Sequence, residues 1–240
     1  MRRFLAGALA VLAAAWSVAV SAAATGYCYA GLVGSKGPLG ISATLTARSA
    51  PVVQAGHVAA WVGVGGPNEA PDGTAEWLQV GMNSARGSFD NHLYYEYARP
   101  GIPVTYVQLA ANIPVGQSVR VAVLKTAKGR DLWRVWVDGK PVSDPISLPG
   151  SEGRLTPVAT AENFDGGSPG VVNTFSYSIA GLRVATRAGG VWRPFNGGEL
   201  RQDDGVQVIR SAAGSFVAGS AVAGSAAAGP SPETRKVLGG

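Results

Sequence analysis

Cysteine is nearly absent from this chain of 240 residues, with Cys28 as the only one. A single cysteine excludes an intrachain disulfide, so the apolar core alone must hold the fold together. Histidine is almost as rare, and His57 and His92 are the only two. They stand at the start of an expected strand and in an expected loop, with no cysteine partner and no histidine-rich spacing. The sequence therefore predicts no metal and no cofactor.

Clusters of lysine and arginine are also missing. The formal net charge is +5, from 20 basic and 15 acidic residues that are scattered along the chain. Without the two arginines near the N-terminus, 18 basic residues stand against 15 acidic ones, a balance of +3. Such a chain lacks the basic stripe that follows a phosphate backbone, so nucleic acid is not expected as a partner.

Long apolar runs are limited to the N-terminus, where Arg2 and Arg3 precede an apolar run from Phe4 to Val20 and an alanine-rich end. This is the layout of a secretory signal peptide, with an A-x-A cleavage site at residues 22–24. The run falls short of the roughly 18 residues of a membrane span, and no second run follows. We expect residues 1–24 to be removed and a monomer without a membrane segment to be secreted, extracellular or in the cell envelope.

The C-terminal segment, residues 211–240, consists mainly of alanine, glycine and serine with two prolines. This composition is typical of disordered tails, because small and polar side chains cannot compensate the entropy lost on ordering. We therefore expect one globular domain over residues 25–210 and a disordered tail after it.

Short segments rich in Val, Tyr, Trp and Thr are abundant, and Gly, Pro, Asn and Asp separate them. Nine such segments are expected to be strands: residues 41–47, 57–64, 76–82, 93–98, 104–110, 117–125, 132–139, 157–162 and 173–185. The pair Asp138-Gly139 predicts a tight hairpin. No window shows a helical period. The pattern predicts an all-β fold, a two-sheet antiparallel β-sandwich of the concanavalin-like or jelly-roll type.

Aromatic, carboxyl and amide side chains gather on some of these strands. Alternation puts Trp77 and Gln79 on one face of their strand, and Tyr94 and Glu96 on one face of the next. A lone polar residue on a sandwich strand usually faces solvent. Beside several aromatic residues, however, the same side chains are also typical of a lined groove.

Five segments resemble, in the same order, the successive motifs of the glutamic peptidases, or eqolisins: WVGV at 61–64, EWLQVG at 76–81, YYEY at 94–97, GQSVRVAV at 116–123 and AENFDG at 161–166. The similarity spans about residues 57–185. It implies a two-sheet β-sandwich with a substrate groove on the concave face of one sheet. It also implies a catalytic pair and groove-lining residues, which are Gln79 and Glu162 for the pair and Trp61, Trp77, Tyr94 and Glu96 for the lining.

The resemblance implies an exported, acid-acting endopeptidase with a polypeptide substrate. Glu162 would act as general base and then acid, and Gln79 would stabilise the oxyanion. The two histidines lie outside the catalytic segments, so neither is expected to take part. A non-catalytic lectin-like module that binds carbohydrate or peptide in an aromatic groove is an open alternative, and a cell-envelope structural protein is a third. A groove with Glu162 turned away from Gln79 would favour the lectin-like module.

Overall fold

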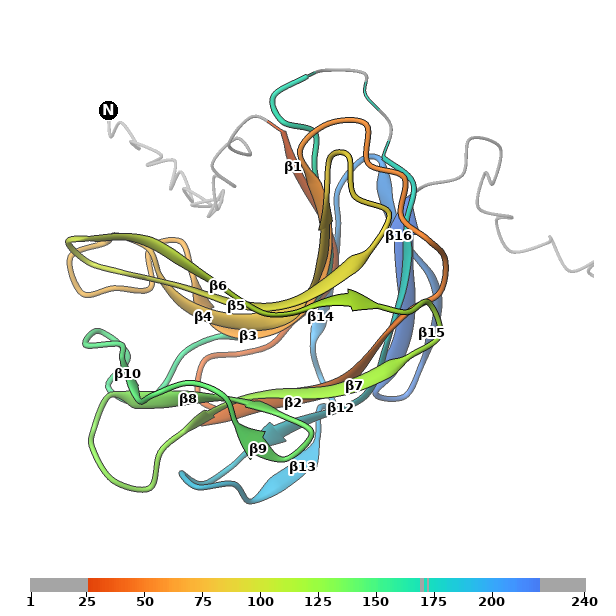
Figure 1. Ribbon diagram of the computed structural model, residues 1–240. Helices are drawn as coiled ribbons and strands as arrows, with labels where there is room; N and C mark the ends of the chain where they lie inside the picture. The colour runs from red at the N-terminus through yellow and green to blue at the C-terminus, as the bar shows by residue number, and fades with distance from the viewer. Residues whose placement is uncertain (1–25, 169–170, 172, 221–240) are drawn as a thin grey trace, which may run out of the picture.

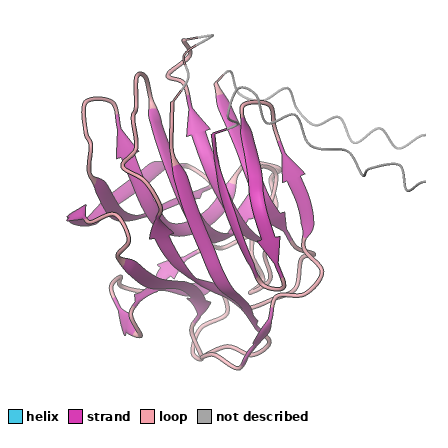
Figure 2. Cartoon of the chain, turned by 90° about the vertical axis from the view of Figure 1, so that its right-hand side faces the viewer, coloured by secondary structure: helices cyan, strands magenta, loops and turns pink. Residues whose placement is uncertain are grey.

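The computed structural model of the protein describes residues 26–168, 171 and 173–220 (Figure 1). These residues form sixteen strands, all paired antiparallel in two sheets, and within them there is no helix (Figure 2). The prediction of an all-β, two-sheet antiparallel fold is confirmed. In the described ranges no helix long and apolar enough to cross a membrane is found. The expected signal peptide, residues 1–24, and residues 221–240 of the expected tail lie outside the described residues.

The first sheet has seven strands in the order β14-β1-β11-β3-β4-β5-β6. Their bounds are β1 Tyr27–Val33, β3 His57–Gly66, β4 Glu76–Ala85, β5 Asn91–Arg99, β6 Ile102–Ile113, β11 Pro157–Phe164 and β14 Glu199–Gln202. Strands β3, β4 and β5 are consecutive in sequence and adjacent in the sheet, and β11 returns to lie beside β3. Segments far apart in the sequence are thus neighbours at the centre of this sheet.

The second sheet has the strand order β10-β8-β7-β2-β12-β16-β15, with β13 beside β12 and β9 beside β8. Its strands are β2 Gly40–Ala47, β7 Ser118–Lys125, β8 Leu132–Val137, β9 Lys140–Pro141, β10 Ile146–Ser147, β12 Ser176–Ala185, β13 Trp192–Pro194, β15 Val206–Ala212 and β16 Ser215–Ser220. Asp138 and Gly139 join β8 to β9 with positive φ angles of 47° and 79°, the conformation of the predicted tight hairpin.

The core lies between the two sheets. Alternate residues of β3 and β4, such as Val62, Leu78 and Val80, are fully buried there, together with Ile41 and Val121 of the second sheet. Side chains on a strand point alternately to its two faces, so the residues between them are turned away from the core. Figure 1 shows β3, β4 and β5 bending, which hollows the face of the first sheet turned away from the second.

The nine predicted strands correspond to β2 to β8, β11 and β12, with boundaries that shift by a few residues. His92, expected in a loop, lies within β5. The predicted end of the domain at residue 210 is ten residues too early, since β16 runs to Ser220. Phe216 and Ala218 of this strand are buried, and a Cβ on Gly219 would come within 2.2 Å of the Phe175 carbonyl oxygen. Small residues here therefore allow close strand pairing rather than disorder.

Candidate active site

The predicted site residues share the hollowed face of the first sheet. Directly opposed residues of an antiparallel pair point to the same side. Gln79 is opposite Glu96 and Gly63, Trp61 is opposite Gly81, and Gly81 is opposite Tyr94. Glu162 on β11 is opposite Ala59, two residues from Trp61, and Trp77 precedes Gln79 by two. All six residues therefore face away from the core, into one groove.

The carboxylate of Glu162 is held by nitrogen atoms on both of its oxygens. The indole Nε1 of Trp61 donates a hydrogen bond to Oε2 at 2.7 Å, and Nε2 of His57 lies 2.8 Å from Oε1. An indole N–H can only donate, so Oε2 is an acceptor in this arrangement. The side chain is buried, with 7% of its area exposed. Its orientation is fixed by β3, the strand that carries both partners.

His57 corrects the expectation that the histidines stand apart from the site. Its ring lies against Glu162 and between two aromatic rings, with centroid distances of 5.9 Å to Tyr27 and 5.3 Å to Phe164. His57, Ala59 and Trp61 alternate on one strand, so this alternation is the signal that could have placed His57 beside Trp61. Its contact with Glu162 depends on the pairing of β3 with β11, which the sequence pattern does not reveal.

Gln79 is buried in the groove and points at Tyr94. Its Nε2 donates a hydrogen bond to the Tyr94 hydroxyl at 3.0 Å, which leaves the second N–H of the amide for another acceptor. Burial, then the charges of Glu162 and Glu96, raise the pKa of Tyr94 well above its ordinary value, and the hydrogen bond from Gln79 lowers it in part. Within the described residues no hydrogen bond joins Gln79 to Glu162 directly. Gln79 acts on Tyr94 through this hydrogen bond, and Glu162 acts on it through its charge.

Glu96 is a second carboxyl group in the groove. Burial raises its pKa above the ordinary value of a glutamate, the charge of Glu162 raises it further, and His57 lowers it in part. The charge of Glu162 is also felt on β1, where burial is the main cause that raises the pKa of Tyr29 and Glu162 is the second. The groove therefore contains one carboxylate with two nitrogen partners and one carboxyl whose pKa is raised.

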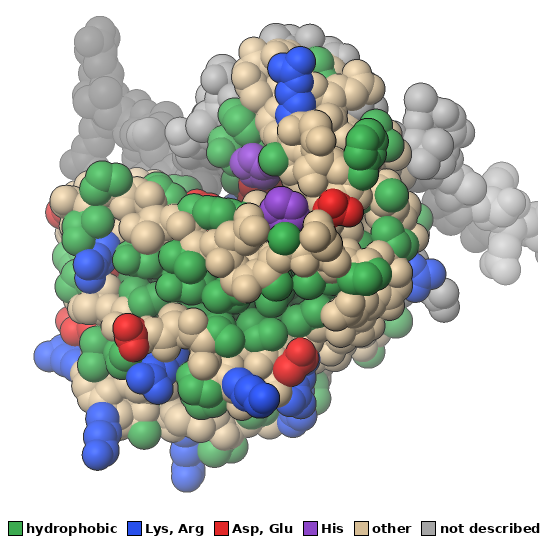
Figure 3. All heavy atoms as spheres, viewed as in Figure 1, with side chains coloured by type: hydrophobic (Ala, Val, Ile, Leu, Met, Phe, Trp, Pro, Cys, Tyr) green, Lys and Arg blue, Asp and Glu red, His purple; other side chains and the backbone are tan. Residues whose placement is uncertain are grey.

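Two glycines form the floor of the groove. A Cβ on Gly81 would come within 2.3 Å of the Ala60 carbonyl oxygen and 2.6 Å of the Trp61 Cβ, and one on Gly63 would come within 2.9 Å of the Gln79 Cβ. No side chain fits at these positions without displacing the groove residues next to them. Figure 3 shows the hollow from outside, with the two histidine side chains in purple at the inside of the bend.

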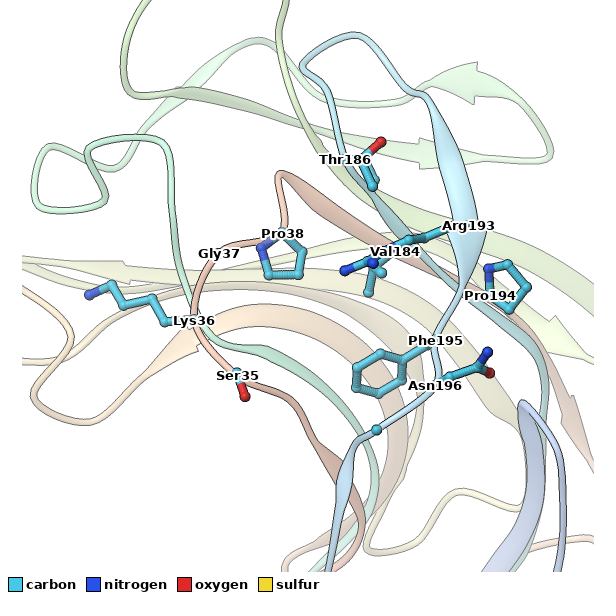
Figure 4. Close-up of a pocket in the computed structure, with 12 residues that line it drawn as sticks. Ser35, Lys36, Gly37, Pro38, Val184, Thr186, Arg193, Pro194, Phe195 and Asn196 are labelled. Carbon is cyan, nitrogen blue, oxygen red and sulfur yellow. The ribbon is translucent and has the colours of Figure 1, made fainter.

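A separate hollow of about 490 Å³ lies away from this groove (Figure 4). Its walls are residues 35–38, 184–186 and 193–197, and none of them belongs to the strands that carry Gln79, Glu96 or Glu162. In the part of the chain that the structure describes, no group of three or more His, Cys, Asp or Glu side chains is placed to hold a metal ion.

Comparison with known proteins places the fold. No protein-family model matches the chain, and a search of curated proteins finds no match. Among solved structures, scytalidoglutamic peptidase bound to a peptide-based transition-state analogue is similar with a TM-score of 0.57 and 18% identity, covering 82% of this chain and 99% of that one. SCP-B, a member of the eqolisin family of peptidases solved with the tripeptide Ala-Ile-His, is similar with a TM-score of 0.51 and 20% identity, covering 83% and 99%. The chain thus has the fold of the glutamic peptidases of the eqolisin family.

Proposed function

We propose that this protein is a glutamic peptidase, an acid-acting endopeptidase that hydrolyses peptide bonds with Glu162 and Gln79. The observation that supports this most directly is the setting of Glu162. A carboxylate fixed by two nitrogen partners, on the same groove face as a buried amide that is 83 residues earlier in the chain, is the arrangement that general-base catalysis needs. The likeness in fold to peptidases supports the same substrate class.

Glu162 takes a proton from a water molecule in the groove, and the oxygen of that water attacks the carbonyl carbon of the scissile peptide bond. As negative charge develops on the carbonyl oxygen, that oxygen accepts a hydrogen bond from the second N–H of Gln79. The Tyr94 hydroxyl holds the other N–H, so the amide is oriented before substrate arrives. Trp61 and His57 keep the carboxylate turned into the groove.

The test is incubation of the purified protein with a denatured protein substrate between about pH 2 and pH 8, with Glu162→Gln beside the wild type. The wild type is expected to cleave in the acid range, within a few pH units of a carboxyl pKa of ~4.3. The variant is expected to lose this cleavage. Full activity in Glu162→Gln would show that another group performs the chemistry. No cleavage by the wild type at any pH would favour the binding module instead.

Export belongs to the same proposal. It rests on the signal-peptide pattern of residues 1–24, and an acid peptidase released from the cell would meet its substrates outside. Mass spectrometry of the protein recovered from the culture medium checks it. An N-terminus near Thr25 supports export with cleavage, whereas a protein that stays within the cell with Met1 present contradicts it.

A further inference from the structure

Two carboxyl groups face the groove from different strands, and their surroundings differ. Both oxygens of Glu162 on β11 have nitrogen partners, Trp61 and His57. Glu96 on β5 makes no hydrogen bond and no ion pair within the described residues. It is partly buried, and burial together with the charge of Glu162 favours its neutral form. Where two carboxyls share a site and their environments separate their protonation, one is suited to be the base and the other the acid.

Glu96 lies close to Gln79, the residue proposed to stabilise the oxyanion. The two residues are directly opposed on β5 and β4, so their Cβ atoms are about 5 Å apart and their side chains leave the sheet together. On its other side Glu96 is opposite Tyr106 of β6. A peptide whose carbonyl oxygen lies at the Gln79 amide would therefore have its backbone within reach of the Glu96 carboxyl.

We propose that Glu96 is a further catalytic residue, the general acid that protonates the leaving amine, while Glu162 serves as the general base. The proposal rests on the peptidase function proposed above. It assigns to two residues the two proton transfers that a single glutamate would otherwise perform in turn.

The proton balance of this division is simple. Glu162 accepts a proton from water as the C–O bond forms, and the tetrahedral intermediate carries its charge on the oxygen at Gln79. When the C–N bond breaks, the carbonyl forms again and the amine nitrogen takes the proton of Glu96. The products are a carboxylic acid and an amine, with Glu162 protonated and Glu96 ionised. One proton passing through groove water from Glu162 to Glu96 restores the starting state.

The titratable groups around Glu96 come from five strands: Glu162 of β11, His57 of β3, Tyr27 and Tyr29 of β1, Tyr94 beside it on β5 and Tyr106 of β6. Burial raises the pKa of Tyr27, Tyr29 and Tyr94, so these three hydroxyls stay neutral in the working range. Of the group, His57 is the one that opposes the raised pKa of Glu96. The neutral form of Glu96 persists to a higher pH than that of an ordinary glutamate, and the alkaline side of the activity profile should follow it.

The experiment compares two substrates that differ in their need for a proton. A peptide amide requires protonation of its leaving amine, whereas the p-nitrophenyl ester of the same acyl peptide releases a stable phenolate. Glu96→Gln is expected to lower amide cleavage by about 10²-fold or more and to leave ester cleavage within about threefold of wild type. Glu162→Gln should lower both. Glu152→Gln, at an exposed glutamate paired only with Arg130, is the matched control and should change neither.

The pH profile is the second readout. Wild-type kcat/KM on the amide should fall on the alkaline side as Glu96 loses its proton, and the ester profile should lack that fall. Glu96→Asp keeps a carboxyl group and should recover part of the amide activity, which also covers the case in which Glu96→Gln fails to fold. Equal loss on both substrates, or none, in a folded Glu96→Gln would overturn the assignment while leaving the peptidase function intact. A wild type that cleaves neither substrate would refute the peptidase function, and the role of Glu96 with it.

Discussion

The two faces of β4 show how differently one strand is used on its two sides. Leu78, Val80 and Met82 are completely buried between the sheets, where any apolar group of suitable volume supplies the same stabilisation. Trp77, Gln79 and Gly81 alternate with them and face the groove, where particular atoms matter: an amide N–H and the missing Cβ of a glycine. Residues that stabilise the fold therefore alternate along β4 with residues proposed to take part in the reaction. Substitutions on the core face should lower stability, and substitutions on the groove face should lower activity.

The largest effect is expected from Gln79→Ala on the groove face. Loss of one oxyanion donor lowers kcat by about 10²- to 10³-fold, whereas the thermal midpoint should change little because no core contact is removed. Steady-state kinetics on a quenched peptide and a thermal melt measure the two. Asn83→Ala, on the same face one row beyond Gly81, is the control and should retain activity. Unchanged kcat in Gln79→Ala would remove the amide from the mechanism.

On the opposite face, Leu78→Ala should act on stability alone. Removing a fully buried leucine side chain costs about 2–5 kcal/mol of unfolding free energy, which chemical denaturation measures. The fraction that remains folded should turn over substrate at the wild-type rate. A strong fall in kcat at full folding would show that the two faces are coupled.

His57→Ala tests the contact between the imidazole ring and Glu162 in the groove. The ring supplies one of the two nitrogen partners of Glu162, and a hydrogen bond to a charged group is worth about 1.5–3 kcal/mol, so kcat/KM should fall by about 10- to 100-fold. His92→Ala is the matched control, because His92 shares the face but contacts Gln108 instead. Equal effects of the two substitutions would argue against a specific role for the bond to Glu162.

The smallest effect concerns Glu76, which is fully buried on the core side of β4 and has one oxygen, Oε2, without a hydrogen-bond partner. Burial raises its pKa, and the N–H of Gly150 opposes the shift. Because the folded state prefers the neutral carboxyl, its contribution to stability is complete below an unfolded pKa near ~4.3. That contribution is lost as the pH rises through the raised folded value.

Glu76→Gln should therefore flatten the decline of unfolding free energy between about pH 4 and pH 7 relative to wild type. Denaturant melts at both pH values give the difference. A decline in the variant that equals the wild-type decline would assign the pH dependence to other carboxyls, with Glu96 as the first to examine.

Alternation and turn chemistry were sufficient to predict the fold, because the long strands of both sheets combine β-branched and aromatic residues with glycine and proline between them. Most strands that escaped prediction are short, such as β9 and β10, or rich in small residues, such as β16, and β15 crosses the predicted end of the domain at residue 210. Strand β1, Tyr27–Val33, was not among the predicted strands, although it lies within the predicted domain. Its pairing with β11 is what brings Tyr29 opposite Glu162.

Prediction of the site depended on distance along the chain. Trp77 and Gln79 could be grouped by alternation within one strand, and Tyr94 and Glu96 within the next. The partners of Glu162 could not be predicted in this way, since they depend on the register between β11 and β3, about a hundred residues apart in sequence. The protonation preference of Glu96 likewise comes from burial and a neighbouring charge on another strand.

The glycine floor of the groove limits how its substrate preference can be redesigned. A side chain at residue 81 would collide with Ala60 and Trp61 of β3, and one at residue 63 would collide with Leu78 and Gln79 of β4, so the depth of the groove cannot be adjusted by substitution there. Residues at the rim can be substituted instead, because the edge strand β6 exposes Val104 and Tyr106. A directed-evolution library for altered cleavage preference should therefore be concentrated on β6 and leave the floor unchanged.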